Sequence, residues 1–145
     1  MKKIFTLLTL SGMLFVACFD DDNNTGNVSQ CDLISKIIEQ GAFDEVPTDN
    51  YQINNVVLNQ DCLEITFASS GCDGNSWGLN LYSTNTINFI FPLQRTVKVE
   101  LINEELCLAF IEKTVSFDLI PFRVEEENEV LLNIVGWDEP VIYQY

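Results

Sequence analysis

Apolar and polar positions alternate with a period of two along most of the chain after residue 51. Short runs of this kind are typical of half-buried antiparallel strands, because successive side chains of a strand point to opposite faces. The seven expected inward-facing sets are Leu63, Ile65 and Phe67; Trp77, Leu79 and Leu81; Val97, Val99 and Leu101; Leu106, Leu108 and Phe110; Val115, Phe117 and Leu119; Val130, Leu132 and Ile134; and Val141, Tyr143 and Tyr145.

Short polar segments separate these runs and predict the turns. Asn59–Asp61, Asn103–Glu105 and Glu126–Asn128 have the length and composition of hairpin connections. About eight strands, one roughly every ten residues, predict an all-β fold, an antiparallel β-sandwich of immunoglobulin-like size. A small β-barrel remains the alternative, because alternation alone does not separate the two.

A helical pattern precedes the strands, from Cys31 to Phe43. Asp32 is a capping residue, and Gly41 ends the pattern. The apolar residues between them share one face of a helix: they are Leu33, Ile34, Ile37 and Ile38. The sequence therefore predicts a short N-terminal helical turn packed against the sheet.

The first residues read as a targeting signal. Lys2 and Lys3 precede an apolar run over residues 4–17, which is shorter than the roughly 20 residues that span a bilayer. Ala17 and Cys18 at its end resemble a bacterial lipobox, in which the cysteine receives fatty acyl chains such as palmitate and becomes the new N-terminus. We expect a lipoprotein signal peptide over residues 1–17. An ordinary signal peptide cleaved near Ala17 is the alternative.

An acidic segment follows Cys18. Residues 18–30 carry Asp20, Asp21 and Asp22 and lack the periodicity of a core-forming element, so they predict a disordered tether before a domain at residues 31–145. Acidic residues just after the lipidated cysteine resemble the surface-export signal of Bacteroidetes lipoproteins. The expected location is the outer membrane, lipid-anchored and exposed at the cell surface. A merely soluble spacer is the alternative.

Composition excludes several classes of function. The 145 residues include 7 Lys and Arg, 22 Asp and Glu and no histidine, for a formal net charge of −15. Without histidine there is no Ser-His-Asp or Cys-His catalytic arrangement and no His-ligated metal. The acidic charge would repel phosphate backbones, so nucleic acid is not an expected partner. We expect no cofactor.

Four cysteines remain once Cys18 is assigned to lipid. An even set in an exported chain indicates two disulfides, with three connectivities open. We favour Cys31 with Cys62 and Cys72 with Cys107, because Cys72 lies in an expected loop and Cys107 begins an expected strand. A site with four thiolates on a metal is the alternative, but no CxxC pair is present.

Several segments together resemble a family of small Bacteroidetes lipoproteins, mainly flavobacterial, that has no assigned activity. The resemblance covers roughly residues 51–145 and names no mechanism. The segments that carry it are Cys62–Phe67, Ser70–Trp77, Gln94–Arg95, Glu105–Ala109, Ser116–Leu119, Leu132–Asn133 and Gly136–Trp137.

The most unusual loop is residues 70–76, called the Cys72 loop below. Its Asp73, Asn75 and Ser76 could offer oxygen ligands to calcium, although the spacing is not that of an EF-hand. The simpler interpretation is a turn, pinned by a disulfide, whose polar side chains accept backbone hydrogen bonds. We expect no metal. Together with the aromatic residue that follows it, Trp77, the loop is a candidate interaction surface.

Other candidates are weaker. Carboxylates cluster at Glu104–Glu105, Glu125–Glu127 and Asp138–Glu139, in turns where solvated charge is expected. Arg95 lies among apolar strands and could bind a ligand carboxylate or pair with an acid. Trp137, in an expected turn, is the aromatic residue we expect to be most exposed.

These observations predict a cell-envelope lipoprotein that acts as a non-catalytic interaction module. The expected partner is a protein or a glycan, with the membrane held through the N-terminal lipid. A small inhibitor or immunity-type lipoprotein acting through the Cys72 loop is one alternative, and a carboxylate-based hydrolase is another. An exposed apolar patch would favour a binding module, a protruding rigid loop an inhibitor, and a pocket with convergent carboxylates of raised pKa an enzyme.

Overall fold

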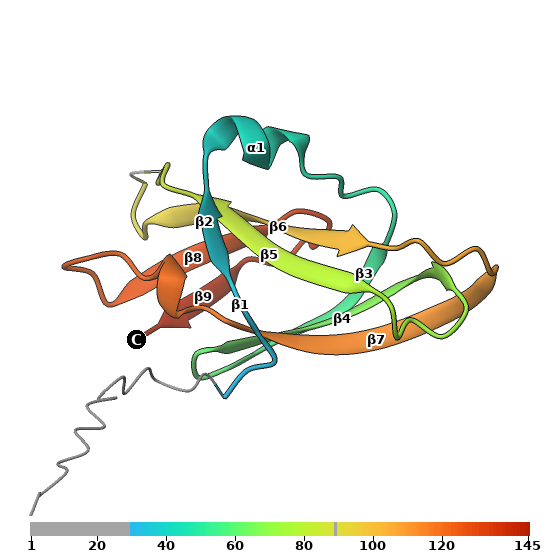
Figure 1. Cartoon of the computed structure of the whole chain (residues 1–145). Helices are drawn as coiled ribbons and strands as arrows, with labels where there is room; N and C mark the ends of the chain where they lie inside the picture. Colours follow the sequence, from blue (N-terminus) through green and yellow to red (C-terminus); the bar gives the residue numbers. More distant parts are fainter. Residues whose placement is uncertain (1–29, 89) are drawn as a thin grey trace, which may run out of the picture.

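The computed structural model describes residues 30–88 and 90–145, which form nine strands in two layers (Figure 1). The first sheet has the order β1 (Leu33–Ile34), β7 (Ala109–Asp118), β4 (Cys62–Gly71) and β3 (Gln52–Asn59). The second has the order β2 (Lys36–Ile38), β5 (Gly78–Thr84), β6 (Gln94–Ile102), β8 (Glu129–Ile134) and β9 (Val141–Gln144). The predicted all-β sandwich is confirmed, and the described strands form two separate sheets rather than one closed barrel. Helical structure in the described residues is limited to α1 (Gln40–Glu45) and the 3-10 turn η1 (Ile120–Phe122).

The core lies between the two sheets, where alternate residues of each strand meet. Leu63, Ile65 and Phe67 of β4 are fully buried, as are Val97 and Val99 of β6. Burying a side chain of this size removes apolar surface from water and stabilises the fold by about 1.5–3 kcal/mol. The predicted inward sets in β4, β6 and β8 are therefore confirmed.

Both sheets are mixed, which corrects the expectation of antiparallel strands throughout. Three neighbouring pairs run parallel: β1 with β7, β2 with β5 and β6 with β8. The turn at Asn59–Asp61 does form the β3–β4 hairpin, with Gln60 at a φ of 54°. The turns at Asn103–Glu105 and Glu126–Asn128 were predicted wrongly, since each lies in a connection between strands of different sheets. Polar composition marks a turn but does not say which strand follows on which layer.

The predicted helix over Cys31–Phe43 is also wrong over most of its length. Residues 33–38 form β1 and β2, and α1 begins only at Gln40 and contains Gly41. The chain pairs first with β7 and then, after Ser35, with β5 in the other sheet. A strand that changes sheet changes its inward-facing side, so its apolar residues do not follow a simple period of two. The resulting spacing of apolar residues matches that of one face of a helix.

One predicted inward set is exposed. Leu106 is 95% exposed, Leu108 92% and Phe110 72%. Phe110 lies an odd number of residues before Val115, which faces the core from the same strand, so the two side chains point to opposite faces. Leu106 and Leu108 precede β7, so only Phe110 of this set belongs to a strand, and its side chain faces outward.

Several expectations concern residues outside the described part of the chain. These are the signal peptide over 1–17, Cys18, and the tether as far as residue 29. No helix in the described part is long and apolar enough to cross a membrane.

Candidate interaction surface

Two disulfides hold the ends of β4. Cys31 bonds to Cys62, the first residue of β4, and Cys72, just after its last residue, bonds to Cys107. This is the favoured pairing, although Cys107 lies two residues before β7 rather than at the start of a strand. The second disulfide joins the Cys72 loop to the segment that carries the exposed apolar residues.

A carboxylate fixes the same segment to the loop from the other side. Glu105 Oε2 accepts hydrogen bonds from the backbone N–H groups of Cys72 at 2.5 Å, Asp73 at 3.2 Å and Gly74 at 3.1 Å. Its Oε1 accepts one from Ser76 Oγ at 2.7 Å. Successive N–H groups aimed at one point form an anion-binding nest, which this chain fills with its own side chain.

The electrostatics agree with this geometry. The hydrogen bond from Ser76 and those from the backbone of Cys72, Gly74 and Asp73 favour the ionised carboxylate and lower the pKa of Glu105 to about 2, against the opposing effect of desolvation. Close approach at this point requires glycine at position 71, where a Cβ would lie 2.5 Å from Glu105 Oε2. Sequence reasoning missed this role of Glu105, which it named only as one of two solvated carboxylates in an expected turn.

Two of the three side chains considered for calcium, those of Asp73 and Ser76, make hydrogen bonds at the loop instead. Asp73 Oδ1 accepts from the backbone N–H of Asn75 at 2.9 Å, and Ser76 donates to Glu105. Lys113 Nζ donates to the carbonyl of Gly74 at 2.8 Å. No group of three or more Cys, Asp or Glu side chains in residues 30–88 and 90–145 could hold a metal. These bonds are typical of a turn that is stabilised by hydrogen bonds to its own backbone and to neighbouring side chains.

The exposed residues Leu106, Leu108 and Phe110 are called the apolar ridge below. They occupy alternate positions on either side of Cys107 and at the start of β7, at the end of the sandwich where β4 and β7 extend farthest (Figure 1). Phe110 also borders a shallow hollow of about 520 Å³ whose other walls include Asn50, Tyr51 and Asn103. The ridge thus combines exposed apolar surface with a fixed backbone.

Two of the predicted interaction residues, Trp77 and Arg95, are buried. Trp77 is only 7% exposed and packs against Phe67, with ring centroids 5.9 Å apart. Arg95 is 5% exposed, and it donates to the backbone carbonyls of Phe122 at 2.8 Å and Thr84 at 2.6 Å rather than to a carboxylate. The expectation that Trp137 is the most exposed aromatic residue is wrong: Trp137 is half-buried against the core, whereas Phe91 and Phe110 are exposed. Asp73, Asn75 and Ser76 do lie together, in the Cys72 loop.

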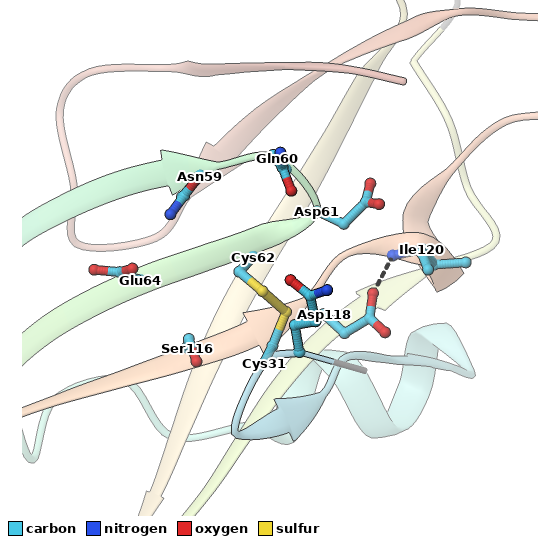
Figure 2. A pocket seen from close by; sticks show the side chains of 10 residues that line it. Cys31, Asn59, Gln60, Asp61, Cys62, Glu64, Ser116, Asp118 and Ile120 are labelled. Atoms are coloured by element: carbon cyan, nitrogen blue, oxygen red, sulfur yellow. Dashed lines mark hydrogen bonds between the residues drawn. A yellow bond between two sulfur atoms is a disulfide. The ribbon is translucent and has the colours of Figure 1, made fainter. Parts of the chain in front are cut away.

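A second hollow, of about 430 Å³, lies at the other end of β4 beside the Cys31–Cys62 disulfide. Figure 2 shows Glu64 on one side of that disulfide and Asp61 and Asp118 on the other. Asp61 accepts from Tyr143 Oη and pairs with Arg123 at 2.6 Å, and these bonds, the first of them above all, lower its pKa. Asp118 accepts from the backbone N–H of Ile120 at 2.9 Å.

Asp61 lacks the property that the general acid of a hydrolytic pair needs. A general acid needs a carboxyl group whose pKa is raised by burial or by a neighbouring negative charge. The hydrogen bonds to Asp61 favour its ionised form instead, and Asp61 ties the β3–β4 turn to the core through Tyr143. We therefore place the candidate site at the apolar ridge.

Comparison with known proteins adds little to this geometry. The chain matches no family model and no curated protein. Two solved structures are similar, each with a TM-score of 0.49. One is a protein of unknown function, DUF1344, from Bacteroides vulgatus, with 19% identity over 78% of this chain and 55% of that one. The other is a putative toxin-related protein from Parabacteroides distasonis, with 14% identity over 77% of this chain and 57% of that one. The chain spans little more than half of each, and a likeness at this level says nothing of what the chain binds.

Proposed function

We propose that the protein is a cell-envelope lipoprotein whose sandwich binds a protein partner, without catalysis, through the apolar ridge. Anchoring by lipid at Cys18 and display on the acidic tether belong to the same proposal. The observation that supports it is the exposure of Leu106, Leu108 and Phe110 on a segment that is held in place at both Glu105 and Cys107.

Exposed apolar side chains are common on proteins, but several in five residues of a fixed segment are not. Ordering a flexible side chain on binding costs about 0.5–1.5 kcal/mol, and a segment already fixed before binding avoids much of that cost for its backbone. The clamp at Glu105 and the disulfide at Cys107 thus prepare the ridge for docking.

The inhibitor or immunity-type function would use the Cys72 loop together with the apolar ridge, which the Cys72–Cys107 disulfide joins. It is favoured by the same observation, because an exposed segment pinned by a disulfide can enter the active site of a partner enzyme. The two functions differ in their consequence for the partner: an inhibitor abolishes the partner's activity at saturation, whereas an accessory module leaves that activity in place.

The test is site-specific photo-cross-linking in intact cells that express the full chain. A photoreactive residue replaces Leu108 in one variant and Ile142 in the control, since Ile142 is also exposed (54%) but lies on β9 of the other sheet. We expect a discrete cross-linked protein from position 108 and not from position 142. The additional change Leu106→Ser should reduce it. Identical products from both positions would contradict the proposal.

A further inference from the structure

The edge of β7 next to the apolar ridge has no neighbouring strand over most of its length. On one side β7 pairs with β4 at all ten of its residues. On the other side β1 pairs only with Phe117 and Asp118. The Asp32 carboxylate accepts hydrogen bonds from the N–H and the hydroxyl of Ser116. Among the described residues, no strand pairs with residues 109–115 on that side.

The direction of the backbone groups along this edge follows from those bonds. The N–H of Ser116 points away from β4, toward Asp32, and the carbonyl of Asp118 accepts from the N–H of Ser35. Alternate residues of a strand point their backbone groups to the same side. The N–H and C=O groups of Phe110, Glu112 and Thr114 therefore face the open edge. Thr114 lies opposite Thr66 of β4, and their Oγ1 atoms are 2.7 Å apart. Side chains approach this closely in pairs that share no backbone hydrogen bonds, which agrees with backbone groups of Thr114 that face away from β4.

Two features by which sheets prevent pairing, proline and a β-bulge, are absent from this edge, and its charged residues are Glu112 and Lys113. Residues 109–115 contain no proline, and the β4–β7 register has no shift. Lys113 is bound to the carbonyl of Gly74. By contrast, β3 at the opposite edge has a register shift between Ile53 and Asn55.

The charge of the chain decides what can occupy this edge. The formal net charge is −15, and Glu112 lies on the outer face of β7, where its carboxylate accepts a hydrogen bond from Asn54 Nδ2 of β3 at 2.7 Å. A second copy would bring acidic surfaces together, and like charges placed opposite each other across strands are destabilising. A segment with lysine or arginine is complementary, and an apolar residue on the same face can pack against Phe110.

We propose that the open edge of β7 binds an extended, basic segment of a partner protein as an added strand of the four-stranded sheet. The inference rests on the proposed function and specifies its partner. Affinity comes from the backbone groups of Phe110, Glu112 and Thr114, and selectivity comes from the acidic charge of the chain, to which Glu112 contributes, and from the apolar ridge.

The test uses the full mature chain in detergent and a fluorescent peptide of about eight residues in which valine and lysine alternate, a length suited to one strand. We expect the valine–lysine peptide to bind. Two variants, one with glutamate in place of lysine and one with alternate backbone nitrogens methylated, should each bind at least about tenfold more weakly. Bound peptide should slow amide exchange at Phe110, Glu112 and Thr114. The same affinity for the methylated peptide, or no binding at all, overturns the proposal.

Two substitutions at one position separate backbone from charge. Glu112→Pro removes an N–H that faces the open edge and leaves the hydrogen bonds to β4 in place, so we expect binding to fall at least about tenfold. Glu112→Gln keeps the N–H and should lower affinity only a few-fold, by the lost charge. Unchanged binding by Glu112→Pro, with circular dichroism like that of the wild type, overturns the inference. If the cross-link from position 108 persists in that case, the proposed function stands without it.

Discussion

Glu105 shows how one side chain sets the conformation of a surface. A carboxylate that accepts three backbone N–H groups and a hydroxyl satisfies donors that a turn of this shape leaves unpaired. Glycine at 71 allows the approach, and glycine at 74 adopts the φ of 69° that the turn requires. The next residue, Leu106, is thereby directed outward.

The pKa of Glu105 leads to a prediction about pH. Its folded-state value of about 2 lies below the ordinary value of 4.5, so its stabilising effect is complete above about pH 5 and is lost as the pH falls toward 2. The difference in free energy of unfolding between wild type and Glu105→Gln should be constant from pH 7 to about 5 and shrink below that. Urea unfolding of both proteins at a series of pH values measures it. A difference that does not change down to about pH 2.5 would show that the clamp does not exist in solution.

At the scale of elements, the two disulfides have different consequences although they close loops of similar length. Their sequence separations are 31 and 35 residues. Cys31–Cys62 ties the chain before β1 to the start of β4, whereas Cys72–Cys107 ties the Cys72 loop to the apolar ridge. Chain entropy alone therefore makes them equal contributors to stability, and only their positions separate their effects on the binding surface.

The paired variant Cys72→Ser with Cys107→Ser should lose up to about 4 kcal/mol of stability by the chain-entropy argument, and so should the matched control Cys31→Ser with Cys62→Ser. Only the first should loosen the apolar ridge. Backbone relaxation by NMR would then give order parameters below about 0.6 at residues 106–108 in that variant and near about 0.85 in the control. Equal rigidity of the ridge in both would mean that the Glu105 clamp is sufficient.

At the scale of the whole molecule, the acidic charge and the proposed anchor act together. A net charge of −15 keeps copies of the chain apart and attracts basic partners, an effect that salt screens. Two or more acyl chains hold a protein stably to a membrane, so attachment needs no spanning helix. The ridge and the open edge of β7 would be presented to partners near that membrane.

The anchor is tested by Cys18→Ala. We expect the wild-type chain to fractionate with membranes and to incorporate labelled palmitate, and the variant to do neither. A wild-type protein without label, found in the soluble fraction, would support the ordinary signal peptide instead. Circular dichroism of both proteins serves as the control, since the change lies outside residues 31–145 and should leave the sandwich intact.

The alternation of apolar residues by itself determined the all-β class, the β3–β4 hairpin and the buried faces of β4, β6 and β8. Those features depend on local periodicity, which a strand carries in its own residues. Three features depend instead on contacts made on folding: β1 and β2 change sheets at Ser35, Asn103–Glu105 joins two layers, and Leu106 and Leu108 face outward. Each of these depends on contacts between residues far apart in the chain, such as Glu105 with Cys72 and Cys107 with Cys72. A periodic pattern gives the two faces of a strand, but the partner across the core decides which face is buried.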